Sequence, residues 1–141
     1  MISFFNDDIE IPKIPKRKTS KWIKSVAKKY NKRVGDISYI FCSDKKILEI
    51  NKKYLNHEYF TDIITFDYSK NNIVSGDIFI SVDTVRSNAE KFGELFQIEL
   101  NRVIIHGILH LCEIDDKTKN ERLIMENQEN EALDMLKQNS Y

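Results

Sequence analysis

The sequence is poor in cysteine and proline and has no long apolar run. Cys42 and Cys112 form no Cys-x-x-Cys pair, which argues against a disulfide scaffold and a structural zinc knuckle. No stretch approaches the roughly 18 apolar residues of a membrane helix, and the N-terminus lacks a signal peptide's basic flank and apolar run. No repeat or linker divides the chain. We therefore expect one domain over residues 1–141, in the cytoplasm and without a membrane partner.

The chain also lacks net charge, but its cations are unevenly distributed. Lys and Arg number 22, as do Asp and Glu, so the overall charge gives no nucleic-acid signal. Residues 11–35 nevertheless contain ten Lys or Arg and no acid. One interpretation is an amphipathic helix whose cations keep its outer face solvated around Trp22 and Val26. The other is a face that meets a phosphate backbone.

Only three histidines occur, and two of them lie four residues apart at the end of an apolar segment. Positions i and i+4 of an α-helix share a face, so His106 and His110 can present nitrogens to one point. Asp116 needs only a turn to join them. Three protein ligands leave a position for water, as in catalytic zinc sites. The pattern favours a metal-dependent hydrolase, although such histidine pairs also occur as ordinary buried or solvated residues.

Hydrophobic periodicity predicts an α+β domain. Strands are expected at residues 2–5, 37–41, 61–68 and 76–82, and helices at about 20–31, 44–55, 83–92, 95–112 and 119–137. Thr19, Asp44 and Asp83 are the expected helix caps. Asn71 and Asn72 predict a hairpin turn between the last two strands. Cys112 points about 200° around its helix from His110, which favours a small buried apolar role over a ligand role.

Four stretches of the chain resemble the YbeY endoribonuclease family of bacterial ribosomal RNA maturation factors. They are Ile50-Asn51 with Tyr54, Thr61-Asp-Ile-Ile-Thr-Phe66, Gly76-Asp-Ile78 and His106-Gly-Ile-Leu-His-Leu111. They match in order and spacing from about Asp36 to the C-terminus, which is more specific than any one motif. The resemblance implies a mixed four-stranded sheet packed by about five helices, with one divalent metal, zinc first, on a central helix.

The same resemblance implies a function. It is single-strand-specific, zinc-dependent cleavage of RNA in small-subunit ribosomal RNA 3′ maturation and ribosome quality control. The implied partners are single-stranded RNA, the small ribosomal subunit and the GTPase Era. Two alternatives remain open from the residues: a ribosome-assembly factor with a mainly structural metal and little cleavage, and a metal-dependent hydrolase of another substrate.

Two positions depart from the family pattern. Asp116 stands where the family has its third histidine, and Asp115 is the alternative ligand. An anionic ligand lowers the site charge by one unit, so bound water should be less acidic and manganese or iron less disfavoured. Leu55 stands where the family has an arginine thought to engage RNA phosphate, and an apolar side chain makes no such contact. Other cations or histidines are expected nearby, but none of them occupies the position of the family's arginine. They are Lys52, Lys53, His57 and Arg86.

The sequence names no catalytic base. Gly107 stands where His-Glu-x-x-His metalloproteases carry their glutamate, which counts against peptidase chemistry. Glu113 and Asp115 are acids expected near the metal. For Asp62 and Asp77 we favour a structural role in turns and strands.

Overall fold

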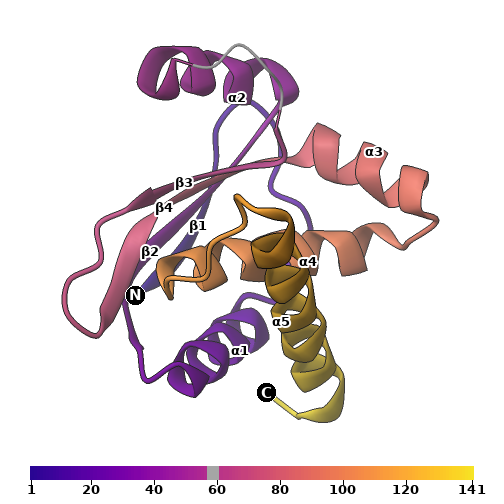
Figure 1. Ribbon diagram of the computed structural model, residues 1–141. Coiled ribbons are helices and arrows are strands. Elements are labelled where there is room, and N and C mark those ends of the chain that lie inside the picture. The colour runs from indigo at the N-terminus through magenta and orange to yellow at the C-terminus, as the bar shows by residue number, and fades with distance from the viewer. Residues whose placement is uncertain (57–60) are drawn as a thin grey trace.

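The fold is a mixed four-stranded sheet with helices packed against it, in a computed structural model that describes residues 1–56 and 61–141 (Figure 1). The strands are β1 (Ile2–Asn6), β2 (Arg33–Cys42), β3 (Ile63–Asp67) and β4 (Ile73–Ser81). The helices are α1 (Lys16–Lys29), α2 (Asp44–Ile50) with the π-helical turn η1 (Asn51–Leu55), α3 (Val82–Phe92), α4 (Phe96–Leu111) and α5 (Lys119–Gln138). The predicted α+β domain is confirmed.

The sheet has the order β1-β2-β4-β3. β1 pairs parallel to β2 and β2 parallel to β4, whereas β3 and β4 form the predicted antiparallel hairpin. Asn71 lies in that turn with φ 56°, in the left-handed region that Asn tolerates. Gly76 is required opposite Asp67, because a Cβ there would lie 2.3 Å from the Phe66 carbonyl oxygen.

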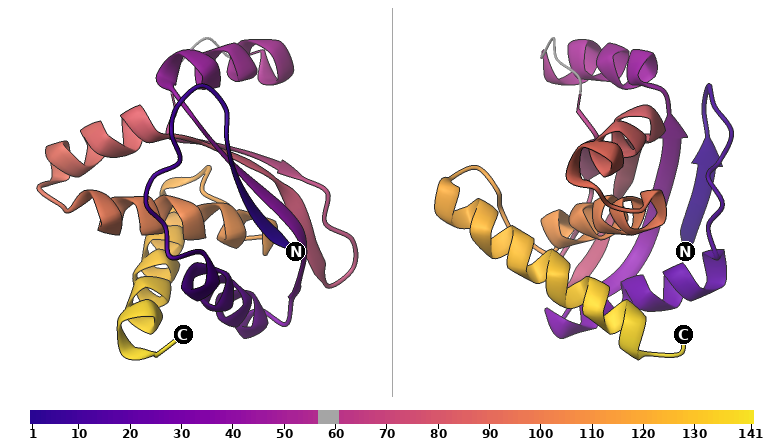
Figure 2. Two further views of the ribbon diagram at one scale, coloured as in Figure 1. Left: turned by 180° about the vertical axis from the view of Figure 1, so that it is seen from behind. Right: turned by 90° about the vertical axis from the view of Figure 1, so that its right-hand side faces the viewer.

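The two faces of the sheet bury different amounts of apolar surface. Alternation along β4 sends Ile78 and Ile80 into the main core, which α1, α4 and α5 complete, and Phe79 into a small second cluster. That cluster includes Ile47 and Ile50 of α2. Figure 2 shows α2 at one end of the molecule and α1 at the other, with α4 between them. No helix in the described part of the chain is long and apolar enough to cross a membrane.

Two of the predicted helix caps are wrong because tertiary partners take over the acids. Ser43 caps α2, its Oγ accepting from the Lys46 N–H, and Ser81 caps α3. Asp83 instead accepts the backbone N–H of Asp44 across the α2–α3 junction at 2.9 Å. The Asp44 carboxylate accepts the Ser81 hydroxyl at 2.5 Å. The two acids therefore join the helices rather than start them.

Two further differences concern helices. Thr19 does not cap α1, since the helix begins at Lys16 and the Thr19 N–H donates to the Pro15 carbonyl at 2.9 Å. The helix predicted to run from residue 44 to 55 is split, because its last turn is the π-helical η1. Asn56 ends that turn in the left-handed conformation.

Candidate metal centre

α4 carries both histidines near its C-terminal end, where it packs closely on the sheet. Its buried residues, among them Leu100, Ile104 and Ile108, lie around most of its surface. Gly107 permits the close approach, because a Cβ there would lie only 3.0 Å from Ile78. This close packing fixes the directions of His106, which precedes Gly107, and of His110, one turn further along the helix.

The two imidazoles and one carboxylate converge on a point beside α4. The Asp116 Oδ2 lies 3.4 Å from His106 Nε2 and 3.4 Å from His110 Nε2. All three candidate ligand atoms lie within 4.8 Å of one another, a group that can hold a metal ion. The side chains of His106 and His110 are only 18% and 28% exposed, so these are not solvated surface residues.

Glu129 of α5 holds the other nitrogen of His106. The His106 Nδ1 lies 2.5 Å from Glu129 Oε2, and since a carboxylate only accepts, Nδ1 is the protonated nitrogen. In the neutral imidazole the lone pair is then on Nε2, the nitrogen that faces Asp116. Arg102 fixes Glu129 in turn, because its Nη1 donates to Glu129 Oε1 at 2.9 Å while its Nη2 reaches Asn130 at 2.8 Å. Carboxylate support of this kind orients metal-binding histidines.

The two histidines have opposite proton affinities. Burial lowers the pKa of His106, but the hydrogen bond and charge of Glu129, with Asp62 and Asp116, outweigh burial and raise it above the ordinary value. Burial and the neighbouring His106 lower the pKa of His110. Opposite shifts keep the pair from being doubly protonated near neutral pH, so at least one imidazole offers a lone pair.

The candidate ligands open onto a cleft of about 690 Å³ between α4, β3 and η1. Its walls are lined by Asn51, Leu55, Thr61, Asp62, Ile63, Ile64, Thr65, Asp67, His106, His110, Leu111, Asp115, Asp116 and Lys117. Lys117 is the sole Lys or Arg among those lining residues. Its ammonium forms no ion pair within the described part of the chain. Leu55 gives the cleft an apolar wall.

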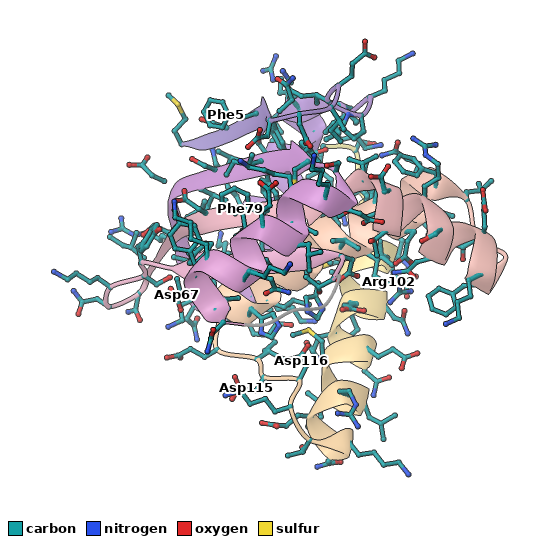
Figure 3. All side chains as sticks on the ribbon, turned by 90° about the horizontal axis from the view of Figure 1, so that it is seen from above. Phe5, Asp67, Phe79, Arg102, Asp115 and Asp116 are labelled. Carbon is teal, nitrogen blue, oxygen red and sulfur yellow. The ribbon has the colours of Figure 1, made fainter. Side chains whose placement is uncertain are left out.

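Of the acids considered near the site, some line the cleft and others lie away from it. Asp115 and Asp116 lie on the loop between α4 and α5, at the opposite edge of the molecule from Phe5 of β1 (Figure 3). Asp62 lines the cleft, and burial raises the pKa of its carboxyl group. Asp77 accepts the Tyr68 hydroxyl at 3.1 Å and keeps its structural role.

The other candidates that the structure describes do not line the cleft. Glu113, with φ 71°, turns away to pair with Lys32 at 3.5 Å. Cys112 is buried as predicted, and burial raises the pKa of its thiol to about 11, so it stays a neutral thiol. The Arg86 guanidinium stacks on Phe96, 4.5 Å from the ring centre. Lys52 and Lys53 lie on η1 but do not line the cleft, and His57 lies outside the described residues.

Sequence reasoning missed Glu129, Arg102 and Lys117. Glu129 and Arg102 lie 27 positions apart and meet only because α5 crosses α4, so no local spacing signals them. Lys117 directly follows Asp116, and that adjacency to a candidate ligand was the available signal.

The chain is similar to proteins of one known family. The family model for the endoribonuclease YbeY matches residues 2–137. The chain is 60% identical over 135 residues to the endoribonuclease YbeY of Parabacteroides distasonis, covering 96% of this chain and 95% of that protein. It is 58% identical over 134 residues to the one of Bacteroides thetaiotaomicron, covering 95% and 98%.

A solved structure resembles the fold as well. The solution structure of TM1509 from Thermotoga maritima superposes with a TM-score of 0.64 at 24% identity, covering 97% of this chain and 92% of that one. At this identity the likeness concerns the fold alone. The full-length match to the family model, together with identities near 60% over almost the whole chain, shows that this protein belongs to the YbeY endoribonuclease family.

Proposed function

We propose that residues 1–141 form a single YbeY-like domain in which His106, His110 and Asp116 hold one divalent metal ion, with zinc as the first candidate. The observation that carries this is the pair of 3.4 Å separations between Asp116 Oδ2 and the two Nε2 atoms. Ligands about 2.05 Å from a tetrahedral zinc ion lie roughly 3.3 Å apart, so both of these separations suit that ion. Two imidazoles and a carboxylate leave one position for water or substrate.

Each residue of the centre has a separate task in this proposal. Glu129 keeps His106 in the tautomer whose Nε2 faces the ion. A bound ion of this kind polarises a phosphate oxygen and lowers the pKa of a coordinated water. Lys117 offers its ammonium to an RNA phosphate that lies along the cleft. Because Leu55 contributes no charge, Lys117 takes over the phosphate contact that the family assigns to an arginine.

The conclusion is a metal-dependent endoribonuclease that cleaves single-stranded RNA. Family membership supports RNA as the substrate and favours cleavage over the two alternatives, a ribosome-assembly factor with a structural metal and a hydrolase of another substrate. The open cleft beside the ligands also favours catalysis, since structural zinc sites are closed by four side chains. We further propose ribosomal RNA processing at the small subunit, in the cytoplasm, with the GTPase Era as a partner.

The test is cleavage of a labelled single-stranded RNA by the purified protein, before and after chelation and after return of zinc, manganese or iron. We expect chelation to abolish cleavage and one metal to restore it. His106→Ala and Asp116→Asn should be inactive with every metal. Cleavage that survives chelation and both substitutions would contradict the proposal, as would metal-dependent cleavage of a non-RNA substrate in preference to RNA.

A further inference from the structure

α1 carries a row of four cations along its outer side. They are Arg17, Lys21, Lys24 and Lys28, named here the basic stripe. Spacings of four, three and four residues bring each cation back to the same side of the helix, over an axial length of about 16 Å. All four are exposed, and none forms an ion pair with another residue that the structure describes.

The opposite side of α1 fixes the direction in which the basic stripe points. Trp22, Ile23 and Val26 are at most 1% exposed, and the Trp22 indole donates to the Ala132 carbonyl of α5 at 2.8 Å. A basic amphipathic helix can also bind an anionic membrane by inserting its apolar face. Here that face is already buried in the core, which leaves charge as the means of binding.

The charge distribution of α1 is unfavourable for the helix itself. The first turn contains Lys16, Arg17 and Lys18 and no acid, although the N-terminus of a helix carries partial positive charge. α5 follows the favourable pattern, with Glu121 in its first turn and a complete capping box from Thr118. Cations at this end of a helix lower its stability. Such an unfavourable arrangement is expected where the surface serves binding.

We propose that the basic stripe is a second RNA-docking surface, separate from the cleft, that binds phosphates of the strand beyond the segment being cleaved. This rests on the proposed endoribonuclease function. No residue of α1 lines the cleft, so the stripe acts on RNA outside it. α1 packs against α4, which carries both histidines, and its Trp22 indole donates a hydrogen bond to α5, so the two surfaces keep a fixed relation.

The test compares two quadruple variants by RNA affinity over a range of salt concentrations. One replaces the basic stripe (Arg17→Gln, Lys21→Gln, Lys24→Gln, Lys28→Gln), and the control replaces four scattered exposed lysines (Lys45→Gln, Lys70→Gln, Lys91→Gln, Lys137→Gln). Each phosphate contact contributes about 0.7 to the slope of log affinity against log salt for a single strand. Loss of the stripe should lower the slope by about 3 and weaken binding of a long RNA at low salt at least about tenfold.

Cleavage of an oligonucleotide short enough to occupy only the cleft should be unchanged in the stripe variant, whereas KM for the long RNA should rise. A slope equal to that of the parent, or an equal loss in the control variant, overturns the docking surface. The parent could instead bind polyglutamate or anionic vesicles tightly, and the stripe variant could lose this binding while it keeps RNA binding. That result overturns RNA as the partner.

The two proposals fail in distinguishable ways. A parent protein that binds RNA through the stripe but cleaves none contradicts the endoribonuclease proposal and supports the stripe. A parent that cleaves the short oligonucleotide while the stripe variant keeps the full salt slope contradicts the stripe alone. A parent that binds no RNA contradicts both.

Discussion

α4 and α1 both contribute to the core on the same face of the sheet, but the polar groups of interest are largely buried on α4 and exposed to solvent on α1. α4 is buried over most of its surface and presents His106 and His110 from its inner end, held by Gly107 and Glu129. α1 buries its apolar side and presents charge to solvent. Burial therefore produces a few groups at fixed distances, suited to binding one ion, whereas exposure produces a flexible row of charges suited to an extended polyanion.

The largest effect should come from removing a candidate ligand on the α4 side. His110→Ala or Asp116→Asn should abolish metal binding and lower RNA cleavage by more than about 100-fold, because even the residues supporting such ligands typically matter 10–100-fold. The measurement is metal content by elemental analysis together with the cleavage rate. Asp115→Asn is the matched control, since this acid shares the loop and the cleft but not the ligand group. A greater loss in Asp115→Asn would transfer the ligand role to that residue.

The supporting carboxylate should have the next largest effect. Glu129→Ala removes the acceptor of the His106 Nδ1 proton and should weaken metal affinity by about 10–100-fold, measured by competition with a chromogenic chelator. Glu129→Gln keeps an acceptor oxygen and should recover part of the loss. Glu126→Ala, an exposed acid on the same helix, should change little. Equal affinities for Glu129→Ala and the parent would show that Glu129 does not position the ligand.

Metal affinity should also depend on pH through the two histidines. A metal binds the neutral imidazole, so protons compete more strongly as the pH falls. Because Glu129 keeps the pKa of His106 above its ordinary value, competition should begin above pH 6.5, whereas His110, with its lowered pKa, should contribute only at more acidic pH. Affinity measured from pH 8 down to about 5.5 should fall, with the decline beginning above pH 6.5. In Glu129→Gln the fall should begin at lower pH, and an unchanged profile would contradict this assignment.

The same shift predicts how the metal-free protein responds to pH. A raised pKa in the folded state means that the His106–Glu129 pair stabilises folding fully below the unfolded-state value of 6.5, and that this contribution is lost as the pH rises through the folded-state pKa. Denaturant unfolding with chelator present should show it, and Glu129→Gln should remove it. Bound metal reverses the trend, since it stabilises the form with neutral histidines.

Lys117 should have a smaller effect, because its ammonium is solvent-exposed. Lys117→Ala should raise KM for RNA by about threefold to tenfold with little change in kcat or metal content, and Lys117→Arg should restore the parent value. Lys119→Ala, two residues further along, is the matched control. A fall in kcat with unchanged KM would instead indicate a role in the chemical step.

The smallest expected effect lies in the first turn of α1. Arg17→Glu places an acid near the positive end of the helix and should stabilise the fold by about 0.3–1 kcal/mol, measured by urea unfolding. The same change should weaken long-RNA binding, so stability and binding move in opposite directions. A destabilised protein would contradict the account of α1 as a helix whose charges serve binding.

The sequence predicted correctly those features that depend on residues close together along the chain. The hydrophobic periodicity of residues 95–112 and the four-residue spacing of His106 and His110 are properties of one helix, and the order of helices and strands along the chain followed from changes in hydrophobic period. The caps predicted at Asp44 and Asp83 were wrong because Ser43 and Ser81 lie before these acids, which found partners on another helix.

The supporting shell of the site was beyond such patterns. Glu129 reaches His106 across 23 residues, and its position depends on the angle at which α5 crosses α4. Asp62 faces the cleft because β3 is an edge strand that begins beside α4. The type of residue indicates what a side chain can do, and packing alone decides which side chains meet.

The most direct test of the central claim is anomalous X-ray diffraction from crystals of the protein loaded with zinc. We expect one strong anomalous peak per chain, within about 2.0–2.2 Å of His106 Nε2, His110 Nε2 and an Asp116 oxygen. No peak at this position, or a peak held by Asp115 or other residues with Asp116 turned away, would contradict it.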